Sequence, residues 1–277
     1  MKLLRRGSPF CAGGRRRSSK RPVHDAGCPA PDAPPVETAA GVALTPTSWW
    51  LVVDTASPRL SLALLRGHEL QAQWGVRSLH PSAHRVVADI AYLLERTGLR
   101  PKDLAALGAL IGPGSFTGIR VGLAAVKGLA QPLNCPIATA TTLEVLADAV
   151  LPLQQPTTVV VLNVSHRREV HGQAFSAGPD AEPRTLTAAL TGEVHTVLEQ
   201  LFRHIPKDCP RLLTGDALAL LDDSNVSAFV GDLPRIAPPP WLAAVAASRL
   251  AARLAAGVTC DAKTLTACYA RAALPTG

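Results

Sequence analysis

The stretch Ile111-Gly-Pro-Gly-Ser-Phe-Thr-Gly-Ile-Arg-Val-Gly122 carries the most specific pattern in this chain of 277 residues. It lies between an apolar, strand-like segment and a helical segment, so it predicts a strand-to-helix turn rich in Gly and Pro. Gly112 and Gly114 permit a close approach of the backbone or a positive φ, and Ser115 or Thr117 can cap the helix. The N–H groups and the dipole of a helix that begins here would favour an anion.

Two common phosphate-binding motifs do not fit this stretch. A Walker A loop needs a Lys after its last Gly, but Gly118 is followed by Ile119. The dinucleotide-binding fingerprint needs a Gly where Thr117 stands, and it needs an acid at the end of the next strand, which residues 137–139 do not supply. Neither a P-loop nor a dinucleotide-binding domain is therefore expected.

The segments around this turn repeat one order of elements. By periodicity and turn residues, the first half predicts strands at 49–53, 60–65, 69–74, 104–111 and 136–139, with helices that begin at 82, 119 and 142. A fainter version follows Pro156, with strands at 158–162, 169–175 and 211–214 and helices at 186–204, 216–221 and 242–256. The sequence therefore predicts an α/β protein of two duplicated lobes, each a mixed sheet with packed helices, at residues 46–155 and 156–277.

The positive charge of the chain is mostly a property of its first 45 residues. The whole chain has 28 Lys and Arg against 21 Asp and Glu, a net charge of +7. Eight of the basic residues and three of the acidic ones precede Thr45, which leaves +5 on this segment and +2 on the remainder. Residues 1–45 are rich in Arg, Pro, Gly and Ala, so we expect a disordered extension, with a basic RNA-contacting arm as the alternative.

The composition excludes several broad classes of protein. With 47% hydrophobic and 18% charged residues, the chain is too apolar to be disordered throughout. The best candidate for a membrane span, residues 241–258, is interrupted by Arg249 and Arg253, which we expect on the polar face of a surface helix. A soluble protein of the cytoplasm, with no membrane partner, is the expectation.

A resemblance to a known family rests on two motifs. Asp54-Thr55-Ala56 after the first strand, taken with the Gly-rich stretch, resembles the glycoprotease-like family, and Ser-Phe-Thr after Gly-Pro-Gly is particular to its TsaB (YeaZ) branch. The likeness is clear over residues 50–149. It implies an actin-like, ribonuclease-H-derived fold. It also implies a non-catalytic dimerisation and scaffold subunit of the tRNA threonylcarbamoyladenosine biosynthesis complex.

The same resemblance implies partners and cofactors. The main partner would be a catalytic TsaD-type subunit, which forms a heterodimer with the chain and modifies the adenosine after the anticodon. A TsaE-type ATPase subunit would join the complex, tRNA would be reached indirectly through it, and the chain could form a homodimer when alone. No cofactor of its own is expected, whereas ATP and a divalent metal are expected in the partner subunits.

Two sets of candidate residues follow from the resemblance. The helices at 82–97 and 116–131 would pack on the equivalent helices of the partner, although the sequence does not separate their partner-facing side from the side that packs in the core. The candidate interface residues are Val87, Ile90, Leu94, Leu123 and Lys127. The candidate contacts to a phosphate or nucleotide are Asp54, Thr55, Gly112, Gly114, Ser115, Thr117 and Gly118. Gly122 and Gly128 are predicted to serve close packing of the second helix.

Catalytic equipment is not indicated by the sequence. The catalytic branch of the family carries a His-x-x-x-His metal pair where this chain reads Ala140 to Glu144, without an imidazole. The first strand of lobe two ends at Leu162-Asn-Val164, also without an acid, so Asp54 cannot complete a two-metal site. We expect Asp54 to cap its turn by accepting from the N–H of Ala56 or Ser57. The alternative is an autonomous ATPase or phosphotransferase that uses Asp54 and the Gly-rich loop.

Overall fold

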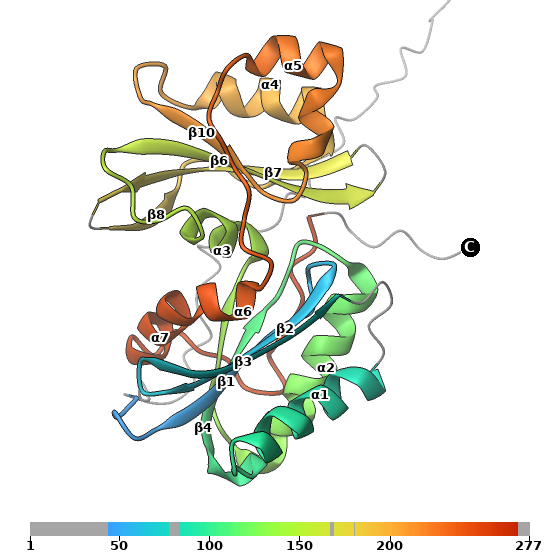
Figure 1. Cartoon of the computed structure of the whole chain (residues 1–277), viewed down its shortest axis with the longest axis vertical. Helices are drawn as coiled ribbons and strands as arrows, with labels where there is room; N and C mark the ends of the chain where they lie inside the picture. Colours follow the sequence, from blue (N-terminus) through green and yellow to red (C-terminus); the bar gives the residue numbers. More distant parts are fainter. Residues whose placement is uncertain (1–43, 78–82, 167–168, 180, 271–277) are drawn as a thin grey trace, which may run out of the picture.

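Two sheets of the same strand order form the frame of the protein. The computed structural model describes residues 44–77, 83–166, 169–179 and 181–270 (Figure 1). Lobe one contains β1 (Trp49–Asp54), β2 (Arg59–Arg66), β3 (Glu69–Arg77), β4 (Leu104–Leu110) and β5 (Ile137–Ala140) in the order β3-β2-β1-β4-β5. Its first three strands form an antiparallel meander, and β4 and β5 run parallel to β1.

The second sheet repeats this arrangement. It contains β6 (Thr157–His166), β7 (Glu169–Gly178), β8 (Ala181–Thr185), β10 (Arg211–Thr214) and β11 (Arg235–Ile236) in the order β11-β10-β6-β7-β8. Again the first three strands are antiparallel, and the last two run parallel to the first. The extra strand β9 (Leu190–Glu193) pairs with β7. The predicted duplication is thus confirmed, and each lobe is a mixed sheet with packed helices, an α/β fold.

Helices cover both sheets in three layers. The outer layer of lobe one contains α1 (Ala83–Arg96) and α2 (Phe116–Leu133), and the outer layer of lobe two contains α4 (Val194–His204) and α5 (Ser224–Val230). Between the sheets lie α3 (Thr142–Asp148), α6 (Leu242–Val245) and α7 (Ala247–Ala255), as Figure 1 shows. Two short 3₁₀ helices, η1 (Pro101–Asp103) and η2 (Leu218–Asp222), complete the described elements.

The helices of the middle layer cross over between the lobes. The segment α3 follows β5 of lobe one but packs on β6, β7 and β8, whereas α6 and α7 follow lobe two but pack on β1, β2 and β5. One continuous hydrophobic core joins all of them. It includes Trp50 of β1, Val161 of β6 and Phe175 of β7, none of which is exposed. Each sheet is therefore covered on its inner face partly by helices from the other half of the sequence.

Lobe two differs most from the sequence-based predictions. The expected helix at 186–204 begins only at Val194, because Leu190 pairs with Gly172 in the sheet and the Thr187 hydroxyl accepts from the backbone N–H of Ala174 at 3.0 Å. The expected helix at 216–221 is the 3₁₀ helix η2, followed by the unpredicted α5. The expected helix at 242–256 is divided at Ala246 into α6 and α7.

Two further outcomes concern the ends of the chain and its helices. The predicted disordered extension at 1–45 lies almost wholly outside the described residues. The helix α2 continues past the expected end at Gln131, holds Pro132 in its last turn and ends at Leu133, before Asn134 with φ of 48°. None of the helices in the described part of the chain combines the length and apolar character that a bilayer crossing needs.

The shared core predicts that the two lobes unfold together. Phe175→Ala should remove about 3–5 kcal/mol from the free energy of unfolding, because it opens a cavity in the layer that both sheets share. Calorimetry should show one transition, with equal calorimetric and van't Hoff enthalpies, that shifts as a whole in the variant. Phe229→Ala, at a partly exposed position of α5, is the control and should cost far less. Two resolved transitions of which only one shifts would contradict a common core.

Candidate functional site

The Gly-rich loop sits directly on the turn that follows β1. The backbone N–H of Ser115 donates to the carbonyl of Ala56 at 2.8 Å. A Cβ atom on Gly114 would overlap this same carbonyl, and one on Gly118 would overlap the carbonyl of Thr55. These two glycines are therefore required because the loop approaches another backbone of the same chain, which is the close approach expected from the sequence.

Three successive carbonyls of the loop region accept hydrogen bonds from three different segments of the chain. The carbonyl of Ile111 accepts from the N–H of Cys268, that of Gly112 from the N–H of Thr142, both at 2.8 Å, and that of Pro113 from the Asn163 side chain at 3.2 Å. Gly112 has a φ of +98°, a conformation that other residues rarely adopt. The loop thus links β4 to the C-terminal segment, to α3 and to β6 of lobe two.

The helix that follows the loop is capped as the sequence predicts. The Ser115 hydroxyl accepts from the N–H of Gly118 at 3.1 Å, which satisfies one of the free donors in the first turn of α2. Ser115 and Thr117 are exposed, whereas Thr55 below them is buried. The structure therefore brings the seven candidate phosphate contacts into one region, with only part of the set at the surface. Binding of a phosphate or nucleotide there stays a prediction.

Asp54 caps its own turn. Its Oδ1 accepts from the backbone N–H of Ala56 at 2.9 Å, and its Oδ2 lies 2.9 Å from the Ser57 hydroxyl and 3.4 Å from that of Ser61. The capping interpretation is confirmed. Burial raises the pKa of Asp54 to about 6, although the hydrogen bonds from Ala56, Ser57 and Ser61 act in the opposite direction.

The surroundings of Ser57 agree with this raised pKa. Its hydroxyl has one proton but lies within hydrogen-bond distance of both Asp54 Oδ2, at 2.9 Å, and the carbonyl of Arg59, at 2.7 Å. A protonated Asp54 can donate to Ser57 while Ser57 donates to Arg59, so both bonds form. An ionised Asp54 must compete with the Arg59 carbonyl for the single hydroxyl proton, which weakens the hydrogen bond from Ser57 that opposes the raised pKa.

An acidic residue of lobe two was missed by the sequence reasoning. The sequence analysis looked for an acid of lobe two at the end of β6 and found none there. Asp216 instead comes just after β10, and its Oδ1 accepts from the N–H of Val164 at 2.6 Å. Arg59, the first residue of β2, interacts electrostatically with the Asp216 carboxylate across the two lobes, which opposes the rise in its pKa caused by burial. The sequence Thr214-Gly-Asp216 could have indicated this residue, because it places an acid after a buried parallel strand, separated from it by one Gly.

The candidate interface residues divide into two groups. Ile90, Leu94 and Leu123 are between 2% and 6% exposed and belong to the core between α1, α2 and the sheet, so these three are core residues and the expectation that they contact a partner is wrong for the folded chain. Val87 is 56% exposed, and Lys127 is partly exposed. The amphipathic helices turn their larger apolar side chains inward, which the sequence pattern did not reveal.

The outer face of α1 and α2 combines exposed apolar residues with small ones. Val87 and Tyr92 of α1 are exposed large residues, and Ala88, Ala124 and Gly128 are exposed small residues on the two helices. A Cβ atom on Gly128 would meet no atom within 4 Å, unlike one on Gly122, which would overlap the Thr55 side chain. Close packing within the chain therefore explains Gly122, but that prediction is wrong for Gly128.

No candidate metal centre stands out. Within the part of the chain that the structure describes, no three His, Cys, Asp or Glu side chains are grouped so that they could hold a metal ion. Glu144, the one acid in the segment where the catalytic branch of the resembled family has its His pair, is engaged by Thr141, whose N–H and hydroxyl both donate to it. Its hydrogen bonds are those of a capping box at the start of α3.

The glycines of α2 give a matched test. Gly118→Ala should destabilise the chain by more than 1 kcal/mol, because its Cβ would overlap a backbone carbonyl that cannot move freely. Gly128→Ala should instead raise the free energy of unfolding, by up to about 1 kcal/mol, since Ala favours the helix and meets open space. Urea unfolding measures both, and equal effects of the two variants would refute this account of the loop.

The pKa of Asp54 gives a test with a definite sign. Because its pKa is raised in the folded state, the native protein binds this proton more tightly, and stability falls as pH rises from the unfolded pKa of about 4 to the folded value of about 6. Asp54→Asn should therefore gain about 2 kcal/mol relative to the wild type between pH 4.5 and pH 7.5. Exposed Asp208→Asn is the control. A gain of zero would mean that Asp54 ionises normally.

Comparison with known proteins gives relatives for part of the chain. The family described as TsaD: tRNA N6-adenosine threonylcarbamoyltransferase matches residues 80–178. The tRNA threonylcarbamoyladenosine biosynthesis protein TsaB of Bacillus subtilis is 34% identical over 97 residues, which is 35% of this chain and 42% of that protein. The TsaB protein of Haemophilus influenzae is 33% identical over 122 residues, 44% of this chain and 51% of that protein. The chain thus spans about half the length of these relatives.

Comparison of structures extends the likeness to both lobes. YeaZ from Pseudomonas aeruginosa superposes with a TM-score of 0.61 at 22% sequence identity, over 79% of this chain and 98% of that one. This likeness concerns the fold, whereas the family match covers residues 80–178, which include the Gly-rich loop. By sequence over part of its length and by fold over both lobes, the chain is similar to TsaB-type proteins.

Proposed function

We propose that the chain is a non-catalytic dimerisation and scaffold subunit in tRNA threonylcarbamoyladenosine biosynthesis, and that it binds a TsaD-type catalytic subunit. The observation that carries this proposal is the outer face of α1 and α2, where Val87 and Tyr92 are exposed and Gly128 faces open space. The names of the sequence relatives supply the pathway. In this proposal the complex acts in the cytoplasm and includes a TsaE-type ATPase, and tRNA reaches the chain only through the complex.

The shape of the α1–α2 face supports docking of other helices. A Gly inside a helix costs about 1 kcal/mol relative to Ala, and no contact within the chain offsets this cost at Gly128. Small residues at 124 and 128 allow a partner helix to approach closely, and Val87 of α1 adds exposed apolar area. Tyr92 is exposed too, with its ring 4.8 Å from that of Trp74 in β3. A stable interface would bury at least about 1,000 Å² in total. The same face could join two copies of the chain when the partner is absent.

The non-catalytic part of the proposal is supported by how the Gly-rich loop is used. The backbone of Thr55 and Ala56 occupies the space beside Gly114 and Gly118. Asp54 is buried, is hydrogen-bonded within its turn and has a raised pKa. Asp54 is a poor ligand for a hydrated Mg²⁺, because both of its oxygens are already engaged in hydrogen bonds within the lobe. ATP and a divalent metal would then act in the partner subunits.

The interface makes a prediction with a matched control. Val87→Glu should weaken binding of the catalytic subunit at least tenfold, about 1.4 kcal/mol, because a charge would be buried against the partner. Val258→Glu, the same change at an exposed position after α7, should leave the affinity unchanged. Isothermal titration calorimetry measures both, with circular dichroism to confirm that each variant is folded. Wild-type affinity of the folded Val87→Glu chain would rule out this face.

Gly128 provides a second variant on the same face. Gly128→Met adds a side chain that meets open space in the free chain, so the monomer should stay folded. It should nevertheless block a closely packed partner helix. Reconstitution then tests the role itself: the catalytic subunit, substrate tRNA and the activated threonylcarbamoyl donor are incubated with the wild type or with the variant. Modification that proceeds equally well without the chain would end the scaffold proposal.

The autonomous ATPase remains the second candidate because of Asp216. This residue gives lobe two the acid that the sequence had not located, and it interacts with Arg59 of lobe one beside the Asp54 turn. Calorimetry of ATP and Mg²⁺ with the isolated chain decides between the two functions. Binding that is abolished by both Asp54→Ala and Asp216→Ala would favour the ATPase, and the absence of heat would favour the scaffold.

A further inference from the structure

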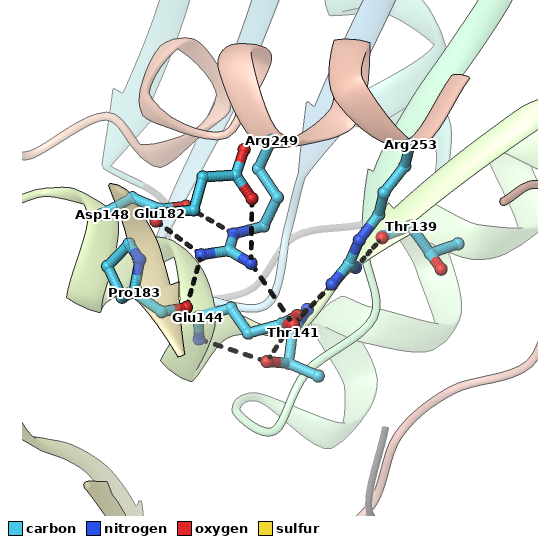
Figure 2. Close-up of polar contacts among 8 residues, drawn as sticks. All are labelled: Thr139, Thr141, Glu144, Asp148, Glu182, Pro183, Arg249 and Arg253. Carbon is cyan, nitrogen blue, oxygen red and sulfur yellow. Dashed lines mark hydrogen bonds and ion pairs between the residues drawn. The ribbon is translucent and has the colours of Figure 1, made fainter. Parts of the chain in front are cut away.

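A buried arginine joins three carboxylates in the middle layer of the protein. The Arg249 side chain of α7 is only 7% exposed, whereas the sequence pattern had placed it on a polar surface. Its Nε and Nη2 atoms each lie 2.7 Å from one oxygen of Asp148, a bidentate ion pair. Its Nη1 atom lies 3.7 Å from both Glu144 and Glu182 (Figure 2).

A second arginine extends this cluster toward the first sheet. Arg253, one turn along α7, donates from Nη2 to Glu144 at 2.5 Å and from Nη1 to the carbonyl of Thr139. Glu144 Oε2 in turn accepts from the N–H of Thr141 at 2.8 Å. Figure 2 shows the two guanidinium groups on either side of Glu144. We call these two arginines with Glu144, Asp148 and Glu182 the interlobe ion cluster.

The members of the interlobe ion cluster come from parts of the fold that belong to different lobes. Arg249 and Arg253 are on α7, which packs on β5, and Thr139 is a residue of β5 in lobe one. Glu144 and Asp148 are on α3, which packs on β6, β7 and β8, and Glu182 is a residue of β8 in lobe two. Polar contacts thus run without interruption from the sheet of lobe one to the sheet of lobe two.

Burial and the arginines act in opposite directions on the carboxyl groups of the cluster. Burial acts to raise the pKa of Glu144, but Arg253, the hydrogen bond from Thr141 and Arg249 together outweigh it and hold that pKa below its ordinary value. For Asp148, burial is the larger effect and raises the pKa, opposed by the hydrogen bond and charge of Arg249. A buried ion pair of this kind gains little stability over a well-packed apolar pair, so its contribution is better sought in geometry.

The geometry of the cluster is restrictive. A bidentate pair between a guanidinium and a carboxylate holds both groups in one plane, and Arg presents its donors in a rigid fork. The apolar contacts of the same layer are less directional. A rotation of one lobe against the other would separate Arg249 from Asp148 or Glu182 and leave charges buried without a partner.

We propose that the interlobe ion cluster is a lock that holds the two lobes in one fixed orientation, with Arg249 as its central positioning residue. The chain then behaves as a single rigid body and does not open and close about the space between its sheets. This inference goes beyond the proposed function, since it concerns the isolated chain and holds whether or not a partner binds the α1–α2 face.

The lock is tested by measuring the distance between the lobes. Spin labels are placed at exposed Glu95 of α1 and exposed Gln200 of α4, on non-natural residues so that the native cysteines stay unlabelled. Pulsed electron spin resonance then reports the distribution of the distance. The wild type should give one narrow distribution. The double variant Arg249→Met, Asp148→Leu removes the bidentate pair without stranding either charge, and its distribution should be at least about twice as wide.

Controls separate loss of the lock from loss of stability. Arg235→Met, Asp222→Leu removes an ion pair of 2.8 Å within lobe two and should leave the distribution narrow. Glu182→Gln keeps the ion pair between Arg249 and Asp148 but weakens the link from Arg249 to β8. The position is half-exposed, so the fold should tolerate the substitution, and the distance distribution should broaden to a smaller extent. A folded Arg249→Met, Asp148→Leu chain with the width and centre of the wild type would overturn the proposal, and so would equal broadening in the control.

Discussion

The burial of one helical layer between two sheets is the constraint on which the rest of the structure depends. The helices α3, α6 and α7 cover the inner faces of both sheets, and their side chains form one apolar core with residues of β1, β6 and β7. Helices from each half of the sequence cover the inner face of the sheet that the other half forms. Neither sheet is therefore fully covered unless both halves are folded. The outer helices, by contrast, pack on a single sheet, which leaves their outer faces available for other contacts.

The Gly-rich loop shows how this constraint reaches the candidate site. Its carbonyls accept from the C-terminal segment, from the start of α3 and from Asn163 of lobe two, so the loop is held where the two halves meet. Its glycines are required by contact with the turn after Asp54. A sequence that resembles an anion-binding loop is therefore used, at least in large part, to pack the chain against itself. This use fits a subunit whose outer helices carry the function.

Part of the fold could be predicted from local sequence because the relevant contacts are local. The order of elements in lobe one, the cap of α2 at Ser115 and the turn capped by Asp54 depend on residues within a few positions of one another. In lobe two the local signal was weaker. Leu190 and Thr187 join the sheet through contacts with Gly172 and Ala174, and such pairing across more than ten residues overrides a helical pattern.

The sequence by itself determined the α/β class, the duplication and the position of the strand-to-helix turn, because periodicity and glycine spacing report local backbone geometry. Only the tertiary structure decided that Ile90, Leu94 and Leu123 are core residues while Val87 is exposed, and that Gly128 faces open space. It also decided that Arg249 is buried against Asp148, a residue 101 positions away in the chain. The physical reason is that an amphipathic pattern states which residues are apolar or charged but not which surface covers them.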